Sequence, residues 1–362
     1  MPIRSFRAAV LTALLLAGAV SVSQAAPFRF DELARAGRVS GFSLSPDGQW
    51  VAYAVGTPLV NENRTAYAIW LASTSASGAP ARRLTTGDKR DTDPAFSPDG
   101  KGIAFLSNRE GGSQIWLLDL AGGEPRKATS FPTEVNAFRW APDGASFVIV
   151  SDVFPDCADV ACLAQRVAAR EKSVTKAHVS ERLLFRHWDS WQNGLRTHLW
   201  KLGVTGGEAM DLTPGDIDAP PFAVGGGTDY EVSPDGRDFV YASNPDKVQA
   251  TSTNGDIWIE PFAGGGRPAD LTANNRAYDG TPHFSPDGKW IAYRAQKRPG
   301  FEADRFTLML LDRATGRSRE LTPTYYNWVN EFAWAPDSKS LYFVSEEQGH
   351  GVIYRVPVEG GL

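Results

Sequence analysis

The sequence predicts an all-β protein, a β-propeller with four-stranded blades, and three observations support this prediction. A turn tetrapeptide of the form Ser-Pro-Asp-Gly recurs with a spacing near 50 residues, which is typical of a propeller blade. Short apolar segments of strand composition follow each copy, and glycine-rich turns separate the later segments. The 35 glycines, 24 prolines and 11 tryptophans also favour turn-rich β structure with large aromatic core residues.

Each copy of the tetrapeptide predicts a hairpin corner between the first two strands of a blade. Proline presets φ near −65°, aspartate caps the local backbone, and glycine adopts the positive φ that reverses the chain. The repetition of the aspartates at blade spacing indicates turn capping and argues against a carboxylate cluster. Successive copies start 52, 44, 92, 52 and 50 residues apart, at Ser45, Ser97, Ala141, Ser233, Ser285 and Ala335, and the last copy ends in Ser338 instead of glycine.

Three further strands are predicted after each corner, which gives the four strands of a blade. The second strands are predicted at Trp50–Tyr53, Gly102–Phe105, Phe239–Tyr241 and Trp290–Tyr293. The third are predicted at Ile69–Leu71, Gln114–Leu120, His198–Leu202, Asp256–Glu260 and Thr307–Leu311. The fourth follow glycine-rich turns at Lys127–Thr129, Asp211–Thr213 and Asp270–Thr272.

The 92-residue spacing predicts one blade with an insertion of about 45 residues, at about residues 151–197. Signals for a third and a fourth strand occur only once in this interval, from His198 to Thr213, which disfavours a second blade without its corner. Within the insertion we expect a helix from about Val160 to Ser173 and a strand over Leu183–Trp191.

The chain divides into a signal peptide at residues 1–25, a lead-in segment at 26–40, and the propeller at 41–362. Arg4 and Arg7 precede an apolar run that ends at Val20, and Ser23-Gln24-Ala25 supplies the small residues of a cleavage site. No later stretch reaches the roughly 20 apolar residues of a membrane span. We therefore expect an exported protein, periplasmic or secreted, with no membrane span after cleavage.

The net charge of −5 argues against nucleic acid or an anionic membrane as a partner, because both are bound through basic surfaces. Cys157 and Cys162 could form a disulfide in an oxidising compartment, or remain free. Two thiols, with His178, His187 and His198 at no recognised spacing, do not make a metal site, and the sequence predicts no cofactor.

The sixth repeat ends at Gly360-Gly361-Leu362, where the fourth-strand segment begins in the other repeats. A propeller that does not close leaves unpaired strand edges, which favour aggregation. We therefore expect this sixth blade to be incomplete and the natural polypeptide to continue.

Two regions resemble exported serine peptidases of the prolyl oligopeptidase family, in the dipeptidyl-peptidase and acylaminoacyl-peptidase branch. The first is the opening of the mature chain, Phe28–Leu33 with Leu44–Gly48. The second is the insertion, through Phe154–Cys157, Cys162 and Arg186–Trp191 followed by Arg196–Leu199. The likeness covers nearly all of the mature chain.

The resemblance implies a propeller stacked over a C-terminal α/β-hydrolase domain, in which the propeller restricts the peptides that reach a Ser-Asp-His triad. The nucleophile of such a domain lies in G-x-S-x-G. The sequence contains no such motif, since Gly41–Ser45 and Gly316–Glu320 both lack the second glycine. We therefore expect peptides as substrates, the hydrolase domain of the parent protein as a partner, and no activity from this chain alone.

A candidate substrate site lies near the end of the insertion, at His187, Trp188, Asp189 and Trp191. Asp189 could pair with the ammonium group of a peptide, as charged hydrogen-bonding partners do. The alternative is that the tryptophans pack the insertion against its blade and that His187 is structural. His350, between two glycines, is interpreted as a loop histidine without a catalytic role.

Two rival functions remain. A periplasmic interaction propeller resembling TolB would share the turns, but TolB-like chains carry a separate α/β domain before the propeller, and the insertion has no counterpart there. An enzyme with a site in the central channel would need a convergent set of histidine and acidic residues, which the sequence does not indicate.

Overall fold

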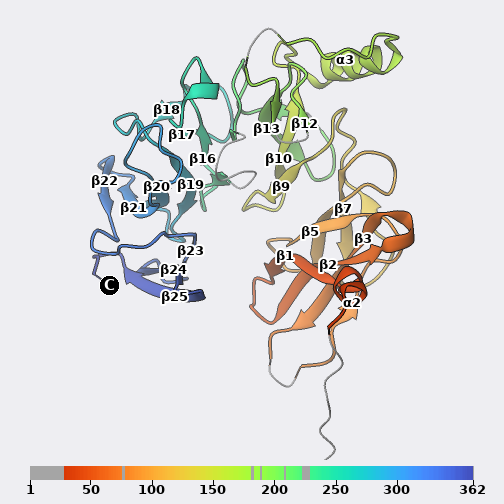
Figure 1. Cartoon of the computed structure of the whole chain (residues 1–362), viewed down its shortest axis with the longest axis horizontal. Helices are drawn as coiled ribbons and strands as arrows, with labels where there is room; N and C mark the ends of the chain where they lie inside the picture. Colours follow the sequence, from red (N-terminus) through yellow and green to blue (C-terminus); the bar gives the residue numbers. More distant parts are fainter. Residues whose placement is uncertain are drawn as a thin grey trace, which may run out of the picture.

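The computed structural model describes residues 28–75, 78–180, 183–187, 190–207, 209–221 and 229–361. Besides a two-stranded sheet within the insertion, six antiparallel sheets of the described residues follow one another along the chain and lie around a common centre (Figure 1). Five have four strands and the sixth has three, so the predicted all-β propeller is confirmed. The predicted signal peptide at residues 1–25 lies outside the described residues.

The six blades take their strands in chain order, with the first strand innermost. Blade 1 contains β1 (Arg38–Leu44), β2 (Trp50–Leu59), β3 (Arg64–Ser73) and β4 (Arg82–Arg83), and blade 2 contains β5 (Asp91–Phe96), β6 (Gly102–Ser107), β7 (Gln114–Asp119) and β8 (Arg126–Lys127). Blade 3 contains β9 (Ala137–Trp140), β10 (Ser146–Val153), β13 (Arg196–Gly203) and β14 (Met210–Asp211), and blade 4 contains β15 (Tyr230–Val232), β16 (Asp238–Ser243), β17 (Asp256–Pro261) and β18 (Ala269–Asp270). Blade 5 contains β19 (Asp279–Phe284), β20 (Trp290–Ala295), β21 (Thr307–Asp312) and β22 (Arg317–Glu320), and blade 6 contains β23 (Glu331–Trp334), β24 (Ser340–Glu347) and β25 (His350–Pro357).

Short helical elements complete the described chain. They are α2 (Phe30–Arg35), the 3-10 turns Val60–Glu62 and Gln249–Thr251, and α3 (Val160–Lys172) in the insertion. None of the helices in the described ranges is both long and apolar enough to cross a membrane. The strand β1 begins at Arg38 and so overlaps the end of the segment 26–40 assigned to a lead-in.

The Ser-Pro-Asp-Gly corners lie between the first and second strands, as predicted. In blade 1 the Ser45 hydroxyl donates to Asp47 Oδ1 at 2.5 Å, and this oxygen also accepts the backbone N–H of Gln49 at 3.0 Å. The hydrogen bond from Ser45 lowers the pKa of Asp47. The aspartate therefore satisfies the backbone of the corner, which confirms the interpretation as a turn cap.

The corners also contact one another from blade to blade. A Cβ built on Gly100 would lie 3.5 Å from Cδ of Pro46, so this glycine faces the proline of the preceding corner. In blade 6 the glycine is replaced by Ser338, whose φ is 60°, and its hydroxyl accepts the N–H of Asp287 at 3.0 Å. The repeated tetrapeptide thus serves contacts between blades as well as the reversal of the chain.

In five blades a threonine that follows the fourth strand bonds to the third strand, because its Oγ1 accepts the backbone N–H of a third-strand residue. We call this hydrogen bond the threonine latch. In blade 5, Thr322 Oγ1 accepts the N–H of Leu308 at 3.1 Å, and the backbone N–H of Leu321 donates to Leu308 O at 2.8 Å. The same latch occurs at 2.9 to 3.0 Å in the other four blades, from Ile69 to Thr85, Ile115 to Thr129, Leu199 to Thr213 and Ile257 to Thr272. The latch completes blades whose fourth strands have only two to four residues.

The long spacing between the third and fourth corners belongs to one blade, as predicted, because β9, β10, β13 and β14 form one sheet. The helix α3 matches the predicted Val160–Ser173 closely. The single strand predicted over Leu183–Trp191 is wrong. The segment forms the hairpin of β11 (Arg186–His187) and β12 (Ser190–Trp191), and no glycine or proline marks this reversal in the sequence.

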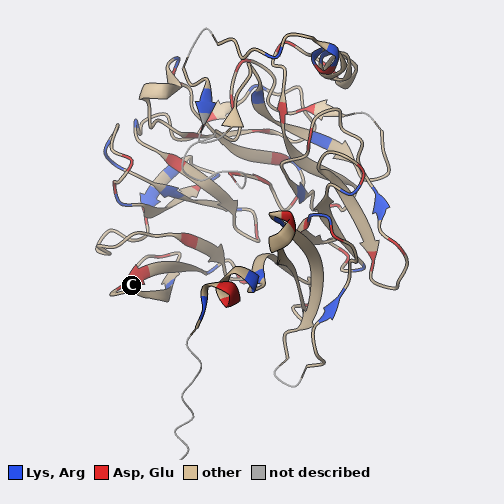
Figure 2. Ribbon diagram, turned by 45° about the vertical axis from the view of Figure 1, so that its right-hand side comes forward, with Lys and Arg blue, Asp and Glu red and all other residues tan. Residues whose placement is uncertain are grey.

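Apolar side chains fill the spaces between successive blades. Two tryptophans that precede a corner also reach back to the preceding blade, since Trp140 Nε1 donates to Ala95 O at 3.2 Å and Trp334 Nε1 donates to His283 O at 3.1 Å. Acidic and basic residues are interspersed over the sheets, without one strongly basic side in this view (Figure 2).

Substitution of Thr322 by valine should destabilise the protein, because the buried N–H of Leu308 would lose its acceptor. A buried unsatisfied donor costs about 1–3 kcal/mol in the free energy of unfolding. Urea denaturation of the variant and the parent chain measures the change. Thr57, an exposed residue of β2, supplies the control Thr57→Val. Equal midpoints for the two variants would show that the latch contributes nothing.

Candidate functional site beneath the insertion

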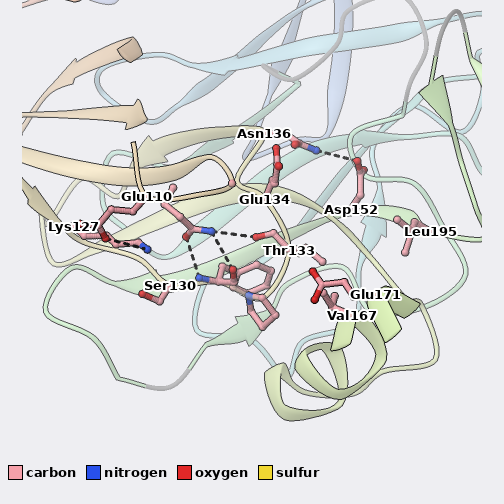
Figure 3. A pocket seen from close by; sticks show the side chains of 14 residues that line it. Glu110, Lys127, Ser130, Thr133, Glu134, Asn136, Asp152, Val167, Glu171 and Leu195 are labelled. Carbon is pink, nitrogen blue, oxygen red and sulfur yellow. Dashed lines mark hydrogen bonds and ion pairs between the residues drawn. The ribbon is translucent and has the colours of Figure 1, made fainter. Parts of the chain in front are cut away.

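The insertion covers a cavity of about 580 Å³ beside blades 2 and 3 (Figure 3). The walls come from the loop before β7, the connection that leads from β8 to β9, the end of β10, the helix α3 and the segment just before β13. These parts belong to the side of the propeller opposite the corners, because β10 ends and the insertion starts there. The lining residues are Glu110, Gly112, Gln114, Lys127, Ser130, Phe131, Pro132, Thr133, Glu134, Asn136, Asp152, Val167, Glu171 and Leu195.

Gln114, at the start of β7, holds the connection between blades 2 and 3 in place. Its Nε2 donates to Phe131 O at 3.0 Å and to Thr133 O at 3.3 Å. Its Oε1 accepts the N–H of Phe131 at 3.0 Å and the Thr129 hydroxyl at 2.8 Å. This buried amide therefore uses all of its bonding capacity on the protein itself and fixes the cavity wall.

The same connection is bonded to blade 3. The Ser151 hydroxyl, near the end of β10, donates to Glu134 O at 2.6 Å and lies 2.6 Å from the Thr133 hydroxyl. A Cβ built on Gly112 would lie 3.0 Å from Cγ of Glu134, so the stem of this glutamate packs over the glycine. The backbone that carries Glu134 is thus held from both neighbouring blades.

Four carboxylates and one ammonium group line the cavity, which gives a net formal charge of −3 (one Lys minus four Asp and Glu). Glu110 lies 3.7 Å from Lys127 Nζ. Asp152 accepts Asn136 Nδ2 at 3.1 Å and the Thr197 hydroxyl at 3.0 Å. Glu134, by contrast, has no cationic partner among the described residues.

Glu171, on the last turn of α3, likewise has a carboxylate without an ion-pair partner within the described part of the chain. It also borders a neighbouring cavity of about 760 Å³, where Arg170 and Lys176 add positive charge. Negative charge is therefore most concentrated on the side of the first cavity that Glu134 and Asp152 form. A cationic group is the ligand chemistry that this side favours.

Of the residues that the sequence proposes for substrate binding, only Trp191 has a described side chain. Trp188 and Asp189 lie outside the described residues, and His187 is described only as backbone of β11. The Trp191 indole stacks on the His178 ring, with centroids 4.4 Å apart and planes at 10°, and also faces Phe185. Trp191 therefore makes packing contacts within the insertion, and 45% of its surface stays exposed.

No sequence pattern indicates the carboxylates of the cavity. Glu134 lies in an irregular connection, Asp152 near the end of a strand, and Glu171 on a helix, 37 positions after the first of them (171 minus 134). No motif joins positions so far apart. Only the insertion, which the sequence does reveal, could have drawn attention to the surface beneath it.

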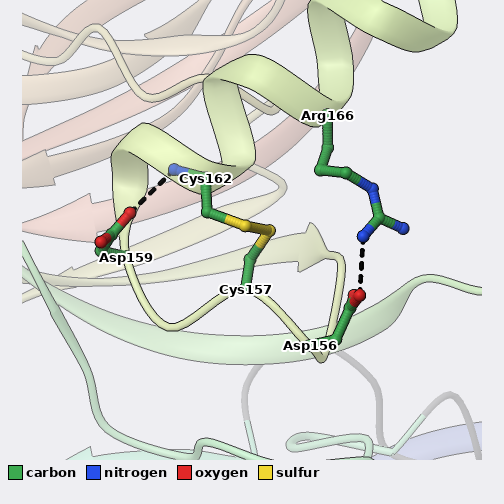
Figure 4. Close-up of a disulfide and its surroundings, with 5 residues drawn as sticks. All are labelled: Asp156, Cys157, Asp159, Cys162 and Arg166. Carbon is green, nitrogen blue, oxygen red and sulfur yellow. Dashed lines mark hydrogen bonds and ion pairs between the residues drawn. A yellow bond between two sulfur atoms is a disulfide. The ribbon is translucent and has the colours of Figure 1, made fainter.

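A disulfide joins Cys157 and Cys162 at the start of the insertion, with Cα atoms 5.4 Å apart (Figure 4). Asp159 caps the helix α3, since its Oδ1 accepts the N–H of Cys162 at 2.8 Å. Arg166 Nη1 donates to Asp156 Oδ2 at 2.6 Å, and this hydrogen bond lowers the pKa of Asp156. These contacts hold the first turn of α3 next to the end of β10.

The end of the insertion is held by ion pairs at the start of β13. Arg196 Nε lies 2.7 Å from Asp216 Oδ1, and Arg196 Nη1 lies 3.0 Å from Asp218 Oδ2. Burial raises the pKa of Asp218. Burial by itself would lower the pKa of Arg196. The interactions with the carboxylates of Asp216 and Asp218 have the larger combined effect, so the pKa of Arg196 is raised.

No group of three or more His, Cys, Asp or Glu side chains in the described ranges is arranged to hold a metal ion. The carboxylates of the cavity can pair instead with an organic cation, since an ammonium group forms charged hydrogen bonds with a carboxylate.

Comparisons with known proteins agree with this architecture. A family model described as "TolB beta propeller domain" matches residues 33–182. Dipeptidyl-peptidase 5 of Porphyromonas gingivalis is 31% identical over 336 residues, which cover 90% of this chain and 47% of that protein. Dipeptidyl-peptidase 5 of Porphyromonas endodontalis is 30% identical over 331 residues, covering 89% and 46%. The chain thus spans about half the length of these curated relatives.

Solved structures show the same fold. An acylaminoacyl peptidase in complex with Z-Gly-Gly-Phe-chloromethyl ketone superposes with a TM-score of 0.66 at 15% identity, over 90% of this chain and 46% of that one. The acylaminoacyl peptidase of Pyrococcus horikoshii gives 0.64 at 15% identity, over 89% and 45%. The chain is therefore a β-propeller whose first half matches the TolB β-propeller model. More particularly, it is a relative of dipeptidyl-peptidase 5, to which it is similar over about half of that protein's length.

Replacement of both cysteines by serine should loosen the insertion and leave the blades intact. A closed loop of this length stabilises by about 2 kcal/mol in the chain-entropy account. We expect faster cleavage by trypsin after the arginines and lysines of α3, with an unchanged far-ultraviolet spectrum of the β structure.

The control for the disulfide experiment is Lys101→Gln, which removes an exposed ion pair of blade 2 worth about 0–1 kcal/mol and leaves the tryptic sites of α3 in place. Reduction of the parent chain with dithiothreitol should reproduce the behaviour of the double serine variant. If trypsin cleaves α3 at the parental rate in the double serine variant and in the reduced parent chain, the disulfide does not stabilise the insertion.

Proposed function

We propose that this chain is the substrate-restricting propeller of an exported serine exopeptidase that acts on short peptides. The observation that carries the proposal is the similarity to dipeptidyl-peptidase 5 over nine tenths of the chain. Because the sequence contains no G-x-S-x-G motif, hydrolysis would require the α/β-hydrolase domain of the parent protein. The propeller would then act by exclusion, since a rigid ring admits short peptides and keeps folded proteins from the nucleophile.

Export is part of the same proposal. The basic and apolar residues within positions 1–25 support secretion to the periplasm or the exterior. The disulfide between Cys157 and Cys162 supports an oxidising compartment, where such bonds persist.

The cavity beneath the insertion favours substrates with a free amino terminus over acylated ones. Its net charge of −3 suits an ammonium group, whereas an acylated terminus carries no charge to recognise. Two unit charges 4 Å apart interact by about 1 kcal/mol in water and about 4 kcal/mol near a protein surface. We assign Glu134 the main attraction, with Glu171 and Asp189, which lies outside the described residues, as further anionic candidates.

An interaction propeller is the second candidate, because the matching family model is that of the TolB β-propeller. The model covers residues 33–182 and so describes the repeated corners of the first blades, which both functions share. A protein of this kind would bind a protein partner and would not react with a serine-directed reagent.

The experiment uses the parent protein with its downstream region and compares a dipeptidyl chromogenic substrate with an N-acyl aminoacyl one. We expect Glu134→Gln to raise KM for the free-amino substrate about threefold to tenfold, because one attractive charge is lost, with kcat nearly unchanged. KM for the acylated substrate should not change. The control is Glu124→Gln, an exposed glutamate of a turn in blade 2 away from the cavity.

Labelling with a serine-directed phosphonate shows which part of the proposal fails, the peptidase activity or the ammonium site in the cavity. Labelling of the parent protein with equal KM effects on both substrates would reject the cavity as the ammonium site but retain the peptidase. No labelling and no hydrolysis would reject the peptidase and favour the interaction propeller.

A further inference from the structure

Blades 2 and 5 lie across the ring from each other and pair their strands in the same register (Figure 1). Asp91 is the first residue of β5, and Asp279 is the first residue of β19. Each aspartate stands opposite the last residue of the second strand, which is Ser107 in blade 2 and Ala295 in blade 5. The two aspartates therefore occupy equivalent positions, and blade 2 shows how this chain satisfies a carboxylate there.

In blade 2 a guanidinium group bonds to this carboxylate. Asp91 Oδ1 accepts the Ser107 hydroxyl at 2.6 Å, and Asp91 Oδ2 accepts Arg109 Nη2 at 2.8 Å. The Arg109 guanidinium also lies over two rings, 5.3 Å from the centroid of Phe105 and 4.7 Å from that of Trp116. This arrangement is favourable, because a planar guanidinium forms directed hydrogen bonds with a carboxylate and stacks on aromatic rings.

In blade 5 the equivalent carboxylate lacks that partner. Only 1% of the Asp279 surface is exposed, and Asp279 Oδ1 accepts Asn275 Nδ2 at 3.0 Å. Asp279 Oδ2 has no hydrogen-bond partner among the described residues. Ala295 replaces the serine of blade 2, and Lys297, which takes the place of the arginine, donates to Glu320 Oε2 at 2.7 Å instead. Because a buried acceptor without a donor is costly, a donor from a ligand would stabilise this oxygen.

Asp279 lines a cavity of about 330 Å³, which we call the blade 5 cavity. Tyr293 and Met309 also line it, and they stand opposite each other as Phe105 and Trp116 do in blade 2. Blade 5 thus keeps an aromatic ring at this place, whereas the smaller methionine replaces the indole and leaves space. The lining residues are Leu271, Thr272, Asn274, Asn275, Asp279, Tyr293, Ala295, Gln296, Lys297, Thr307, Met309, Ser318 and Glu320.

Among the charges of the blade 5 cavity, Asp279 is the carboxylate left for a ligand. The lining has a net formal charge of −1 (one Lys minus one Asp and one Glu). Glu320 already pairs with Lys297 and lies 3.5 Å from Arg305 Nη2. Burial raises the pKa of Asp279 to about 8, and the nearby Asp256 adds to the increase. A cation beside Asp279 Oδ2 would favour the ionised carboxylate and lower this pKa.

We propose that the blade 5 cavity binds the guanidinium group of an arginine side chain from another molecule. The guanidinium donates to Asp279 Oδ2, as Arg109 donates to Asp91 in blade 2, and its plane lies along the ring of Tyr293. The volume fits such a group, since pockets for small ligands begin at about 300 Å³. The site does not depend on the proposed peptidase function, because no part of it involves hydrolysis.

The lining also indicates how the ligand enters and why it carries a guanidinium. Asn274 and Ser318 are exposed, so an arginine side chain reaches the cavity from the surface. A lysine ammonium is a compact and strongly hydrated charge that lacks the planar fork and stacks less well on a ring. A citrulline side chain has nearly the same shape as arginine but carries no charge to pair with the carboxylate.

Isothermal titration calorimetry of the full chain with N-acetyl-L-arginine amide tests the proposal, at a pH above the pKa of Asp279. We expect saturable binding, with the corresponding lysine and citrulline amides bound about tenfold more weakly or less. Asp279→Asn should weaken the binding of the arginine amide about tenfold, because the charge is lost while an acceptor for Asn275 is kept. Thermal unfolding checks that this variant folds.

A second pair of variants tests the space in the cavity. Met309→Trp introduces the residue that blade 2 has at this place, and it should weaken binding of the arginine amide because the indole fills the cavity. The matched control is Met210→Trp, the same exchange at a methionine of blade 3 that is 37% exposed and lies outside the cavity. This control should bind the arginine amide as the parent chain does.

Three results would overturn the proposal: no binding of the arginine amide, equal affinity for the arginine and citrulline amides, or parental affinity in the Asp279→Asn variant. Loss of binding in Glu134→Gln with retention in Asp279→Asn would assign the cation to the cavity beneath the insertion instead. If the site is confirmed, titration with free L-arginine identifies the source of the group. Tighter binding of the amide indicates an arginine within a peptide, and tighter binding of free L-arginine indicates the amino acid itself.

Discussion

The structure depends on burial between successive blades, because a small twisted sheet can cover both of its faces only with neighbouring sheets. The repeated corner serves this constraint directly. It reverses the chain, satisfies its own backbone through an aspartate such as Asp47, and rests its glycine against the proline of the preceding corner. The tryptophan bonds from Trp140 and Trp334 add polar contacts between the same sheets. Order in each blade therefore requires an ordered neighbour.

Most of the ring could be predicted from the sequence because its elements repeat. A corner that recurs at blade spacing locates the first two strands, and the apolar segments with the glycine-rich turns between them locate the other two. The reversal within Leu183–Trp191 escaped prediction because tertiary packing, including the stack of Trp191 on His178, determines it without a local turn signal. The carboxylates of the cavity escaped for a related reason. Glu134 and Glu171 come together only when the insertion folds back over the blades.

The cavity combines a wall held by two blades with a cover that belongs to the insertion. Gln114 and Ser151 fix the connection that carries Glu134 from two blades at once. The cover is the helix α3, attached through the disulfide at one end of the insertion and through Arg196 at the other. Glu134 is therefore carried by backbone that two blades hold, and Glu171 is carried by a helix of the insertion.

The attachment of the insertion has a consequence for how such proteins diversify. The strands β10 and β13 pair over eight residues, from Ser146 with Gly203 to Val153 with Arg196, and the insertion leaves and returns at the same end of this ladder. The blade is thus complete whatever length of polypeptide bridges Val153 and Arg196. The segment between Val153 and Arg196 can therefore be replaced during evolution without loss of the blade. Ligand preference can then diverge between related proteins that keep the same propeller.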